Sequence, residues 1–507
     1  MTAEATTAER SRALDLASRA ERALELDFSR PVAFAALAAV YVLSRLPWLG
    51  HGYGTDPDAW RVALTAHYLW DHGEYWPSRL PGYPLHEFVT AALIRGGAPA
   101  TNLSTVLASL AGVWVFARLL AALRLPSRGL LTATFALAPL LWINSVTTMD
   151  YMWALTFGLG AYLAAIRERS LVAGVLVGIA AGFRLTYLGM ALPLGLYLWR
   201  SGRLRDVVPL AAGAAAAAAV AFAPVFWVYR GDFWNFYDQK VPLLNFLRLL
   251  GKDGLGLIGA IWTLAALGMA ARRLATLPRD LARDPHLWMW VGVVILYAVS
   301  FTRLPHEIAY LIPLFPFGFF LMARYFPRWL LVATCGVIVL AGFVDITSPG
   351  DEIDASTFTH ARIGKGMLFS SLETMDNQID FANEVRDDLA IPEHSVVIMG
   401  FTYPHFAVLN HDRFENAILE KDYRAISMLS DRGVTIDRER DVLYVWLLKY
   451  QTFLGLKRQG YRFYYVPDAA RSTAAVFEYR PGYYGADELA TSRESPSEGA
   501  GAASTDR

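Results

Sequence analysis

Long apolar segments dominate this chain and restrict it to folds that bury such segments in a membrane. About 20 consecutive apolar residues cross the hydrocarbon core of a bilayer. Only 18% of the residues are charged, whereas soluble chains carry roughly 25%. The sequence therefore predicts an α-helical polytopic membrane protein. The apolar segments are 31–49, 103–123, 127–143, 151–166, 171–199, 207–228, 254–271, 286–302, 307–323 and 327–346.

The apolar segment 171–199 is too long for one crossing and holds Arg184 near its middle. As a single helix it would measure roughly 43 Å at 1.5 Å per residue, against a hydrocarbon thickness of about 30 Å. A single crossing would also place Arg200, Arg203 and Arg205 outside the cell, in conflict with the positive-inside rule. We therefore predict two short helices that meet near Arg184, about eleven transmembrane helices in all, a cytoplasmic N-terminus and an extracytoplasmic C-terminus.

The composition divides the chain into four parts. Residues 1–30 are charged and rich in Ala and Leu, which is typical of a cytoplasmic amphipathic helix, and residues 31–348 form the transmembrane domain. Residues 349–486 have the composition of a small soluble α/β domain, expected outside the cell. Residues 487–507 are polar and should be disordered. In the α/β domain we expect strands at 395–401, 441–448, 461–467 and 474–480, and helices at 371–389, 414–430 and 448–459.

Charge and cysteine content exclude several functional classes. The formal net charge is zero, so the bulk charge indicates no nucleic-acid partner. Cys335 is the single cysteine, which rules out an intramolecular disulfide and a cysteine metal cluster. Candidate catalytic and binding residues are expected in the loops that the predicted topology places at the outer membrane face.

Three aspartates lie at the predicted outer ends of the spans. Asp56 and Asp58 are two residues apart in the first outer loop, and Asp150 is the only acid between Glu87 and Glu168. Each of the three could simply help to start a helix. Alternatively, one of them could act as a general base on an acceptor hydroxyl, and Asp56 and Asp58 could together hold a divalent metal, Mg²⁺ or Mn²⁺. The residues alone leave both interpretations open.

Cationic side chains on the same face suit a lipid phosphate. Arg184 could snorkel to the membrane surface, but a charge inside an apolar span is by default a functional-site hypothesis. The segment "SFTRLPHEIAYLIPLFPF" adds Arg303, His306 and Tyr310 at the start of another span. Arginine binds phosphate through two parallel hydrogen bonds. We therefore expect Arg184, Arg303, His306 and Tyr310 to bind a donor phosphate.

Aromatic rings are crowded in the first outer loop. Trp60, Trp76 and Tyr83 could stack on a sugar, with Glu307 as a further sugar contact, or they could belong to the interfacial aromatic belt. The stretch "AWRVALTAHYLW" that follows Asp58 predicts a helix on the outer leaflet. Acids that deprotonate a hydroxyl and cations that hold a phosphate together indicate sugar transfer from a polyprenyl-phosphate carrier.

In these motifs and their order, the chain resembles the GT-C fold glycosyltransferases. This superfamily includes the protein O-mannosyltransferases, the lipid A aminoarabinose transferases and the mannosyltransferases of GPI and N-glycan assembly. The resemblance covers roughly 31–346 and rests on "TDPDAW", "SRLPGYP", "TTMDYMWAL", "GFRLTYL" and "RLPHEIAYLIP". Most relatives have Asp-Glu in the first loop, and the Asp-Pro-Asp found here leaves open which aspartate is the base and whether a metal is needed.

The resemblance implies an inverting transfer of mannose, or of another hexose or pentose, from polyprenyl phosphate to a lipid, glycan or protein acceptor at the outer face of the plasma membrane. Arg184 and Arg303 would neutralise the leaving phosphate, with His306 as a proton or hydrogen-bond donor. Asp58 would be the base, with Asp56 and Asp150 as further catalytic acids.

Two other functional classes stay open on the sequence. A transporter or flippase of lipid-linked sugars should show internal repeats and charges near the midplane of the membrane. An oligosaccharide ligase or polymerase would use a pyrophosphate-linked donor at the same face. The sequence determines neither the sugar, nor the acceptor, nor the length of the lipid.

Overall fold

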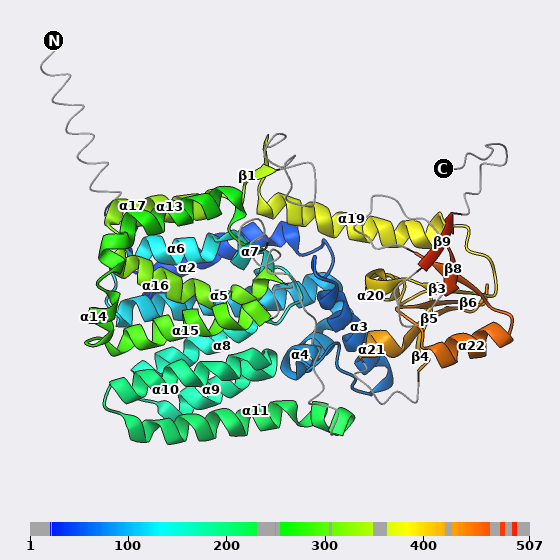
Figure 1. Cartoon of the computed structure of the whole chain (residues 1–507), viewed down its shortest axis with the longest axis horizontal. Coiled ribbons are helices and arrows are strands. Elements are labelled where there is room, and N and C mark those ends of the chain that lie inside the picture. The colour runs from blue at the N-terminus through cyan, green and yellow to red at the C-terminus, as the bar shows by residue number, and fades with distance from the viewer. Residues whose placement is uncertain are drawn as a thin grey trace, which may run out of the picture. The chain divides into compact units, whose positions relative to one another are not determined.

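The protein folds into two compact units (Figure 1). The helical unit comprises Met1–Tyr53 and Pro81–Glu373, and the sheet unit comprises Gly54–Leu80 and Thr374–Arg507. The computed structural model describes residues 23–230, 254–303, 307–347, 362–420, 428–466, 477–481 and 489–493, together with Glu21 and Leu249. His306, most of the helix expected at 1–30 and most of the tail expected to be disordered at 487–507 lie outside the described residues.

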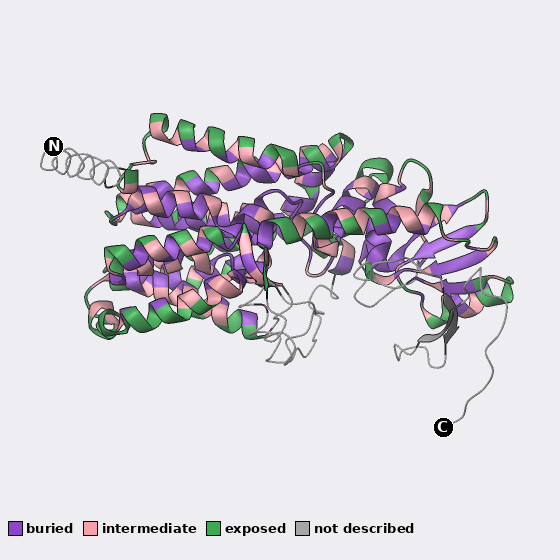
Figure 2. Ribbon diagram, turned by 90° about the horizontal axis from the view of Figure 1, so that it is seen from above, coloured by how far each residue is buried: buried purple, intermediate pink, exposed green. Residues whose placement is uncertain are grey.

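The helical unit consists of apolar helices joined by short turns. In Figure 2 its long helices carry buried residues along one side and exposed residues along another. On α11 the exposed side is apolar, because Val208, Val220 and Trp227 are 72%, 76% and 86% exposed, as expected of a surface that faces lipid. The elements are α2 (Pro31–Arg45), η1 (Leu46–Trp48), α4 (Pro84–Leu93), η2 (Ile94–Gly96), α5 (Gly97–Ala122), α6 (Arg128–Leu137), α7 (Pro139–Ser145), α8 (Tyr151–Ile166), α9 (Ser170–Phe183), η3 (Leu185–Met190), α10 (Ala191–Arg200), η4 (Leu204–Asp206), α11 (Val207–Tyr229), α13 (Gly256–Leu274), α14 (Leu277–Leu281), α15 (Pro285–Arg303), η7 (Ile308–Leu311), α16 (Leu314–Tyr325), α17 (Arg328–Leu340) and the hairpin of β1 (Val344–Thr347) with β2 (Arg362–Lys365). Helix α19 (Met367–Asp387) runs through the boundary of the two units.

The helices confirm an integral membrane protein with several apolar spans. Within the described residues, five helical segments are long and apolar enough to cross a membrane: Pro31–Trp48, Pro84–Ala122, Leu204–Tyr229, Gly256–Leu274 and Pro285–Thr302. Shorter apolar helices are Tyr151–Ile166, Ser170–Phe183, Leu314–Tyr325 and Arg328–Leu340. The predicted number of about eleven spans is not confirmed by these segments.

The long apolar segment 171–199 is broken where the sequence predicts. Helix α9 ends at Phe183, and Arg184 has an extended backbone with φ −151° and ψ 110°. The chain then continues as η3 and α10. The break therefore leaves Arg184 at the junction of two short helices, as expected from the length of the segment and from its central charge.

Helix α9 packs closely against α11 through a row of small residues. Gly174, Gly178 and Gly182 recur every fourth residue and so share one face of α9. A Cβ atom on Gly178 would lie 2.5 Å from the Cβ of Ala217, and one on Gly182 would lie 2.6 Å from the Cβ of Ala221. Small residues at such spacing let two membrane helices approach until their backbones nearly touch. This packing holds the end of α9, and with it Arg184.

We expect Gly178→Ala to destabilise the helical unit by about 1–3 kcal/mol, because the added methyl group overpacks the α9–α11 contact. The thermal unfolding midpoint of the purified protein measures the effect. Gly268→Ala on α13 is the matched control, since its Cβ would meet no atom within 4 Å. Equal midpoints for the two variants would contradict the tight contact.

The sheet unit contains a seven-stranded mixed sheet in the order β4-β5-β6-β3-β7-β8-β9. Strand β3 is parallel to β6 and β7, and the other neighbours are antiparallel. Val396, Val445 and Phe463 form its core together with Phe453 and Leu456 of a covering helix. The strands are β3 (Ser395–Ile398), β4 (Glu415–Ile418), β5 (Gly433–Asp437), β6 (Val442–Val445), β7 (Arg462–Tyr465), β8 (Phe477–Pro481) and β9 (Leu489–Arg493), and the helices besides α19 are α3 (Pro57–His72), α20 (Tyr403–Leu409), α21 (Leu429–Arg432) and α22 (Tyr450–Arg458).

Helix α3 belongs to this sheet unit, which differs from the expectation of a helix on the outer leaflet. It begins at the N-cap Asp56 and ends at Gly73, whose positive φ of 67° suits a glycine. Its apolar face packs on α20 and α21 of the same unit, and Trp60, Val62 and Ala63 are fully buried. The apolar side chains that suggested a lipid surface are therefore used for protein packing.

Two expectations for the C-terminal part were wrong in detail. Residues 414–430 do not form one helix: β4 pairs with β5, and in the described part of this range only Leu429 and Ser430, at the start of α21, are helical. Pairing with the β-branched residues of β5 overrides a weak local helical pattern. Strand β9 pairs with β8 inside the tail expected to be disordered, because backbone pairing requires no hydrophobic composition.

His405 of α20 is buried and neutral in the folded protein. Its ring lies 4.7 Å from that of Trp60, and its Nδ1 lies 3.2 Å from the carbonyl oxygen of Phe401. Burial lowers the pKa of His405 to about 3, because the charged imidazolium would lose its hydration. In the unfolded chain the same side chain takes up its proton near pH 6.5.

We therefore expect the free energy of unfolding to fall as the pH falls from about 6.5 towards 3, by up to about 1.4 kcal/mol per pH unit from His405 alone. The sign follows because the unfolded state binds the proton that the folded state excludes. Unfolding midpoints of the wild type and His405→Gln, measured from about pH 7.5 to about 4.5, should show a shallower decline for the variant. The control is His72→Gln at the exposed end of α3. Identical slopes for wild type and His405→Gln would refute this role.

Candidate active site

The candidate site of the helical unit is a buried ion pair between Arg184 and Asp150. The Nη1 atom of Arg184 lies 2.6 Å from Oδ2 of Asp150, and the two side chains are 8% and 0% exposed. Arg184 stands at the break that follows α9, and Asp150 directly precedes α8. The structure thus brings together two residues that the sequence predicts at one membrane face.

Three tyrosine rings surround the guanidinium of Arg184. The Cζ atom of Arg184 lies 4.0 Å from the ring centre of Tyr151, 4.6 Å from that of Tyr310 and 5.6 Å from that of Tyr83. Aromatic faces attract a cation at these distances. Tyr83 and Tyr310, predicted as ligand contacts, therefore lie beside Arg184.

Arg184 keeps hydrogen-bonding capacity beyond its contact with Asp150. A guanidinium has five N–H donors. Among the residues that the structure describes, Asp150 is the one acceptor of a hydrogen bond from the guanidinium of Arg184. A buried pair is costly to form because both charges lose water. Donors that remain beside such a pair can bind the oxygens of an anion.

The loop before Asp150 is held by a buried polar network. The side-chain amide of Asn102 donates to the carbonyl oxygen of Gly52 over 2.9 Å, and its oxygen accepts from the hydroxyl of Thr148 over 2.8 Å. The backbone N–H of Thr148 donates to the carbonyl oxygen of Tyr53 over 2.7 Å. Asp150 stands at the N-cap position of α8 without making a side-chain cap hydrogen bond. The network and the pair with Arg184, rather than capping, account for its place.

The structure describes the remaining residues of the "RLPHEIAYLIP" segment only in part. Glu307 directly precedes η7, and its carbonyl oxygen accepts from the backbone N–H of Tyr310 over 3.1 Å. Arg303 is the last residue of α15, and the structure describes its backbone only. His306 lies outside the described residues. Their roles as phosphate and sugar ligands remain predictions.

Asp58 lies in the sheet unit, between two buried arginines. Its Oδ1 is 3.0 Å from Nη1 of Arg61, and its Oδ2 is 2.9 Å from Nε of Arg79. Arg61 also donates from Nε to the hydroxyl of Ser430 over 3.1 Å. Both carboxylate oxygens of Asp58 are therefore engaged, Oδ1 within α3 and Oδ2 with Arg79 of the chain that follows the helix.

The other residues expected in the first loop contribute to packing. Oδ1 of Asp56 accepts the backbone N–H of Asp58 and so caps α3. Trp60 is fully buried and donates from Nε1 to the carbonyl oxygen of Gly54 over 2.9 Å, so it offers no open face to a sugar. The ring of Trp76 lies 4.2 Å below the guanidinium of Arg432.

The expected site residues therefore fall into two groups. Asp56, Asp58, Trp60 and Trp76 belong to the sheet unit, whereas Tyr83, Asp150, Arg184, Arg303, Glu307 and Tyr310 belong to the helical unit. The helical group contains the buried ion pair, and the sheet group contains Asp58 between Arg61 and Arg79, which we call the Asp58 clamp.

Sequence reasoning missed Glu87, Arg61 and Arg79. Glu87 is fully buried in the first turn of α4, where its Oε2 lies 3.4 Å from the backbone nitrogen of Tyr83. A single acid in the apolar stretch "PLHEFVTAALI" was a usable signal, since a buried charge requires a partner or a function. The spacing of Arg61 three residues after Asp58 likewise allows a contact on one helix face.

We expect Asp58→Asn and Arg79→Gln each to lower the stability of the sheet unit by about 1–3 kcal/mol, the range for lost charged hydrogen bonds. The double variant should cost less than the sum, because it leaves fewer uncompensated charges. Chemical denaturation of the purified protein measures this cycle. Asp388→Asn, at the exposed end of α19, is the control. Strictly additive costs would argue against the clamp.

Comparisons with known proteins identify the fold. No family model and no curated protein sequence matches the chain. Among solved structures, the chain is similar to ArnT from Cupriavidus metallidurans bound to undecaprenyl phosphate, with a TM-score of 0.54 and 14% identity over 86% of this chain and 94% of that chain. The apo state of this ArnT has a TM-score of 0.52 and 16% identity over 86% and 92%. The chain thus has an ArnT-like fold, which confirms at the level of the fold the resemblance seen in its sequence.

Proposed function

We propose that this protein is a membrane glycosyltransferase that takes its sugar from a polyprenyl-phosphate donor. The observation that carries the proposal is Arg184, a buried guanidinium held by Asp150 and three tyrosine rings, with N–H donors left for a phosphate. The fold supports the choice of donor, because the similar ArnT structure is bound to undecaprenyl phosphate.

The proposed reaction is a single displacement at the anomeric carbon. A bond forms between the acceptor oxygen and C1 of the sugar while the bond from C1 to the phosphate oxygen breaks, so the configuration inverts. The hydroxyl proton passes to a carboxylate, and the polyprenyl phosphate leaves with the additional negative charge. A cation already placed where negative charge develops is usually the largest contribution to such a rate, and Arg184 suits this role.

Asp58 is the proposed general base, and Asp150 orients Arg184. Asp58 is 24% exposed, whereas Asp150 is fully buried and committed to its ion pair. Arg61 and Arg79 contact the two carboxylate oxygens of Asp58 over 3.0 and 2.9 Å. To accept a proton, Asp58 must expose one carboxylate oxygen to the acceptor hydroxyl, so the arginine bound to that oxygen must move away. Asp56 contributes by capping the helix that carries Asp58.

A Mg²⁺ or Mn²⁺ ion at Asp56 and Asp58 fits this arrangement poorly. Both oxygens of Asp58 already face guanidinium groups, and Oδ1 of Asp56 accepts a backbone hydrogen bond. A divalent cation would have to displace an arginine and would meet the positive charge of both. No catalytic step is therefore assigned to a metal at these residues.

We place the reaction at the outer face of the plasma membrane, with the N-terminus in the cytoplasm, on the distribution of arginines among the loops. The donor sugar is mannose or another hexose or pentose, and the acceptor is a lipid, a glycan or a protein. The junction between Phe183 and the start of η3, where Arg184 is extended, is the proposed position of the lipid headgroup.

We expect Arg184→Ala to lower kcat/KM for the polyprenyl-phosphate sugar roughly ten- to hundredfold, because a charge-assisted contact to phosphate contributes about 1.5–3 kcal/mol. Arg184→Lys should recover part of the loss, since lysine lacks the planar fork. Transfer from radiolabelled donors by reconstituted protein measures the effect.

Two further variants separate binding from support of the fold. Arg200→Ala, on the exposed end of α10, should transfer sugar at the normal rate. Asp150→Asn combined with Arg184→Gln removes both charges and tests a purely structural role of the pair. Recovered transfer in that double variant would contradict the phosphate-binding role, and translocation of the donor without any glycosylated product would favour a flippase.

A further inference from the structure

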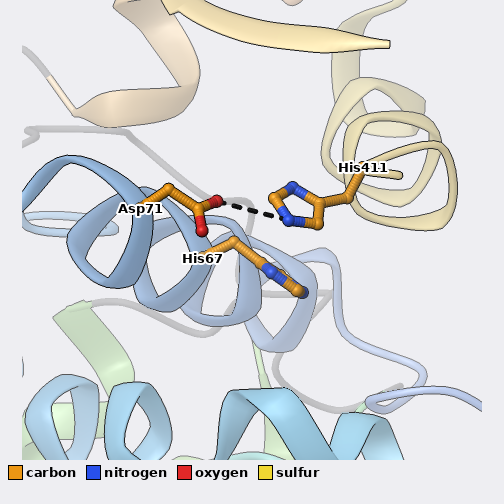
Figure 3. Close-up of side chains that lie close together, drawn as sticks. All are labelled: His67, Asp71 and His411. Carbon is orange, nitrogen blue, oxygen red and sulfur yellow. Dashed lines mark ion pairs between the residues drawn. The ribbon is translucent and has the colours of Figure 1, made fainter. Parts of the chain in front are cut away.

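Two histidines and an aspartate converge in the sheet unit, away from the residues used above. His67 and Asp71 are four residues apart on α3 and therefore lie on one face of it. His411 lies two residues after the end of α20 and approaches the same face. Figure 3 shows the carboxylate of Asp71 directed at the imidazole of His411, with the ring of His67 lying beside that imidazole.

The ligand atoms of these three side chains lie within 4.8 Å of one another. Nε2 of His411 is 3.2 Å from Oδ2 of Asp71, and the rings of His67 and His411 are 4.0 Å apart. Bonds of about 2.0–2.1 Å around a tetrahedral Zn²⁺ separate neighbouring ligand atoms by roughly 3.3 Å. Side-chain rotations that shorten the widest separation by about 1.5 Å, from 4.8 Å to roughly 3.3 Å, would therefore bring the three into coordination.

The composition of the cluster matches a transition metal better than Mg²⁺ or Ca²⁺. Imidazole nitrogens bind Zn²⁺ and its first-row neighbours, whereas Mg²⁺ and Ca²⁺ prefer sites made of oxygens alone. Two histidines and one carboxylate are a known three-ligand set for Zn²⁺ with a water in the fourth position. Within the described residues, no other group of three or more His, Cys, Asp or Glu side chains has its ligand atoms this close.

We propose that His67, Asp71 and His411 bind one Zn²⁺ ion, or a similar first-row divalent ion, which fastens the C-terminal end of α3 to the chain after α20. The ligands come from the two sequence segments of the sheet unit, Gly54–Leu80 and Thr374–Arg507. Arg79 on Asp58 and Arg61 on Ser430 attach the opposite end of α3. The ion thus supplies the second attachment of this helix.

A second histidine–aspartate pair in the same unit shows what the triad adds. His394 lies 2.6 Å from Asp441 through Nδ1. Its ring stacks on Tyr461 at 4.0 Å rather than on a second histidine. That pair has two metal ligands where the cluster on α3 has three, so it provides an internal control of similar chemistry.

The test uses the full-length protein without an affinity tag, stripped with EDTA and titrated with Zn²⁺ alone. Calorimetry and elemental analysis should give about one ion per chain, and Zn²⁺ should raise the unfolding midpoint. His67→Gln, Asp71→Asn and His411→Gln should each weaken binding about a hundredfold or more, since even second-layer residues of metal sites contribute 10–100-fold. His394→Gln should bind as the wild type does.

Spectroscopy and unfolding measurements exclude non-specific binding of the metal and unfolding of the variants as explanations. Co²⁺ in the site should give the visible d–d bands of a four-coordinate ion, and each ligand variant should lose them. The ligand variants should unfold at the midpoint of the metal-free wild type, which shows that they are folded. Absence of stoichiometric Zn²⁺ binding by the wild type, or binding that survives in all three variants, would overturn the proposal. The outcome is independent of sugar transfer, which the test does not measure.

Discussion

The ion pair of Arg184 and Asp150 is the interaction around which the helical unit is arranged. Withdrawing the two charges from water costs several kcal/mol for each ion. That cost is offset by the direct contact between Arg184 and Asp150 and by the three tyrosine rings around the guanidinium. Packing of α9 on α11 fixes one partner, and the network of Asn102 fixes the other. Well-packed apolar side chains would stabilise a bundle at least as well. Stability alone therefore does not account for the two charges, whereas the anion binding proposed above would.

The sheet unit binds one helix, α3, that comes from a distant part of the sequence. Helix α3 has the local signals of a helix in its Asp56 cap and its terminal Gly73. Those signals start and stop a helix but do not position it. Position comes from side chains that reach residues after Thr374, and Trp60 on His405 is the most buried of them. The Asp-Pro-Asp motif of the first loop thus begins a helix whose partners lie near the other end of the chain.

The sequence predicted what depends on local pattern and on the chemistry of single residues. The break at Arg184, the apolar helices and strands β3, β6, β7 and β8 follow from hydrophobic periodicity and charge placement. The pairing of β4 with β5 and the burial of Trp60 could not be predicted, because both depend on contacts between segments far apart in the chain. For the same reason the sequence showed Asp58 as an acid in a loop but could not show Arg79 beside it. Asp150 and Arg184 were predicted individually, and their direct contact emerged with the fold.

The division of the sheet unit between two distant stretches of chain has a consequence for biosynthesis. The ribosome delivers Gly54–Leu80 first and reaches Thr374 only after the intervening helices of the other unit. At about 5–20 residues per second, Trp60 and its apolar neighbours on α3 remain without their partners for a period on the order of tens of seconds. During that interval the nascent helix exposes the surface that α20 later covers. The membrane bundle can therefore assemble while this helix waits, and a chain that stops before Thr374 has nothing to cover it.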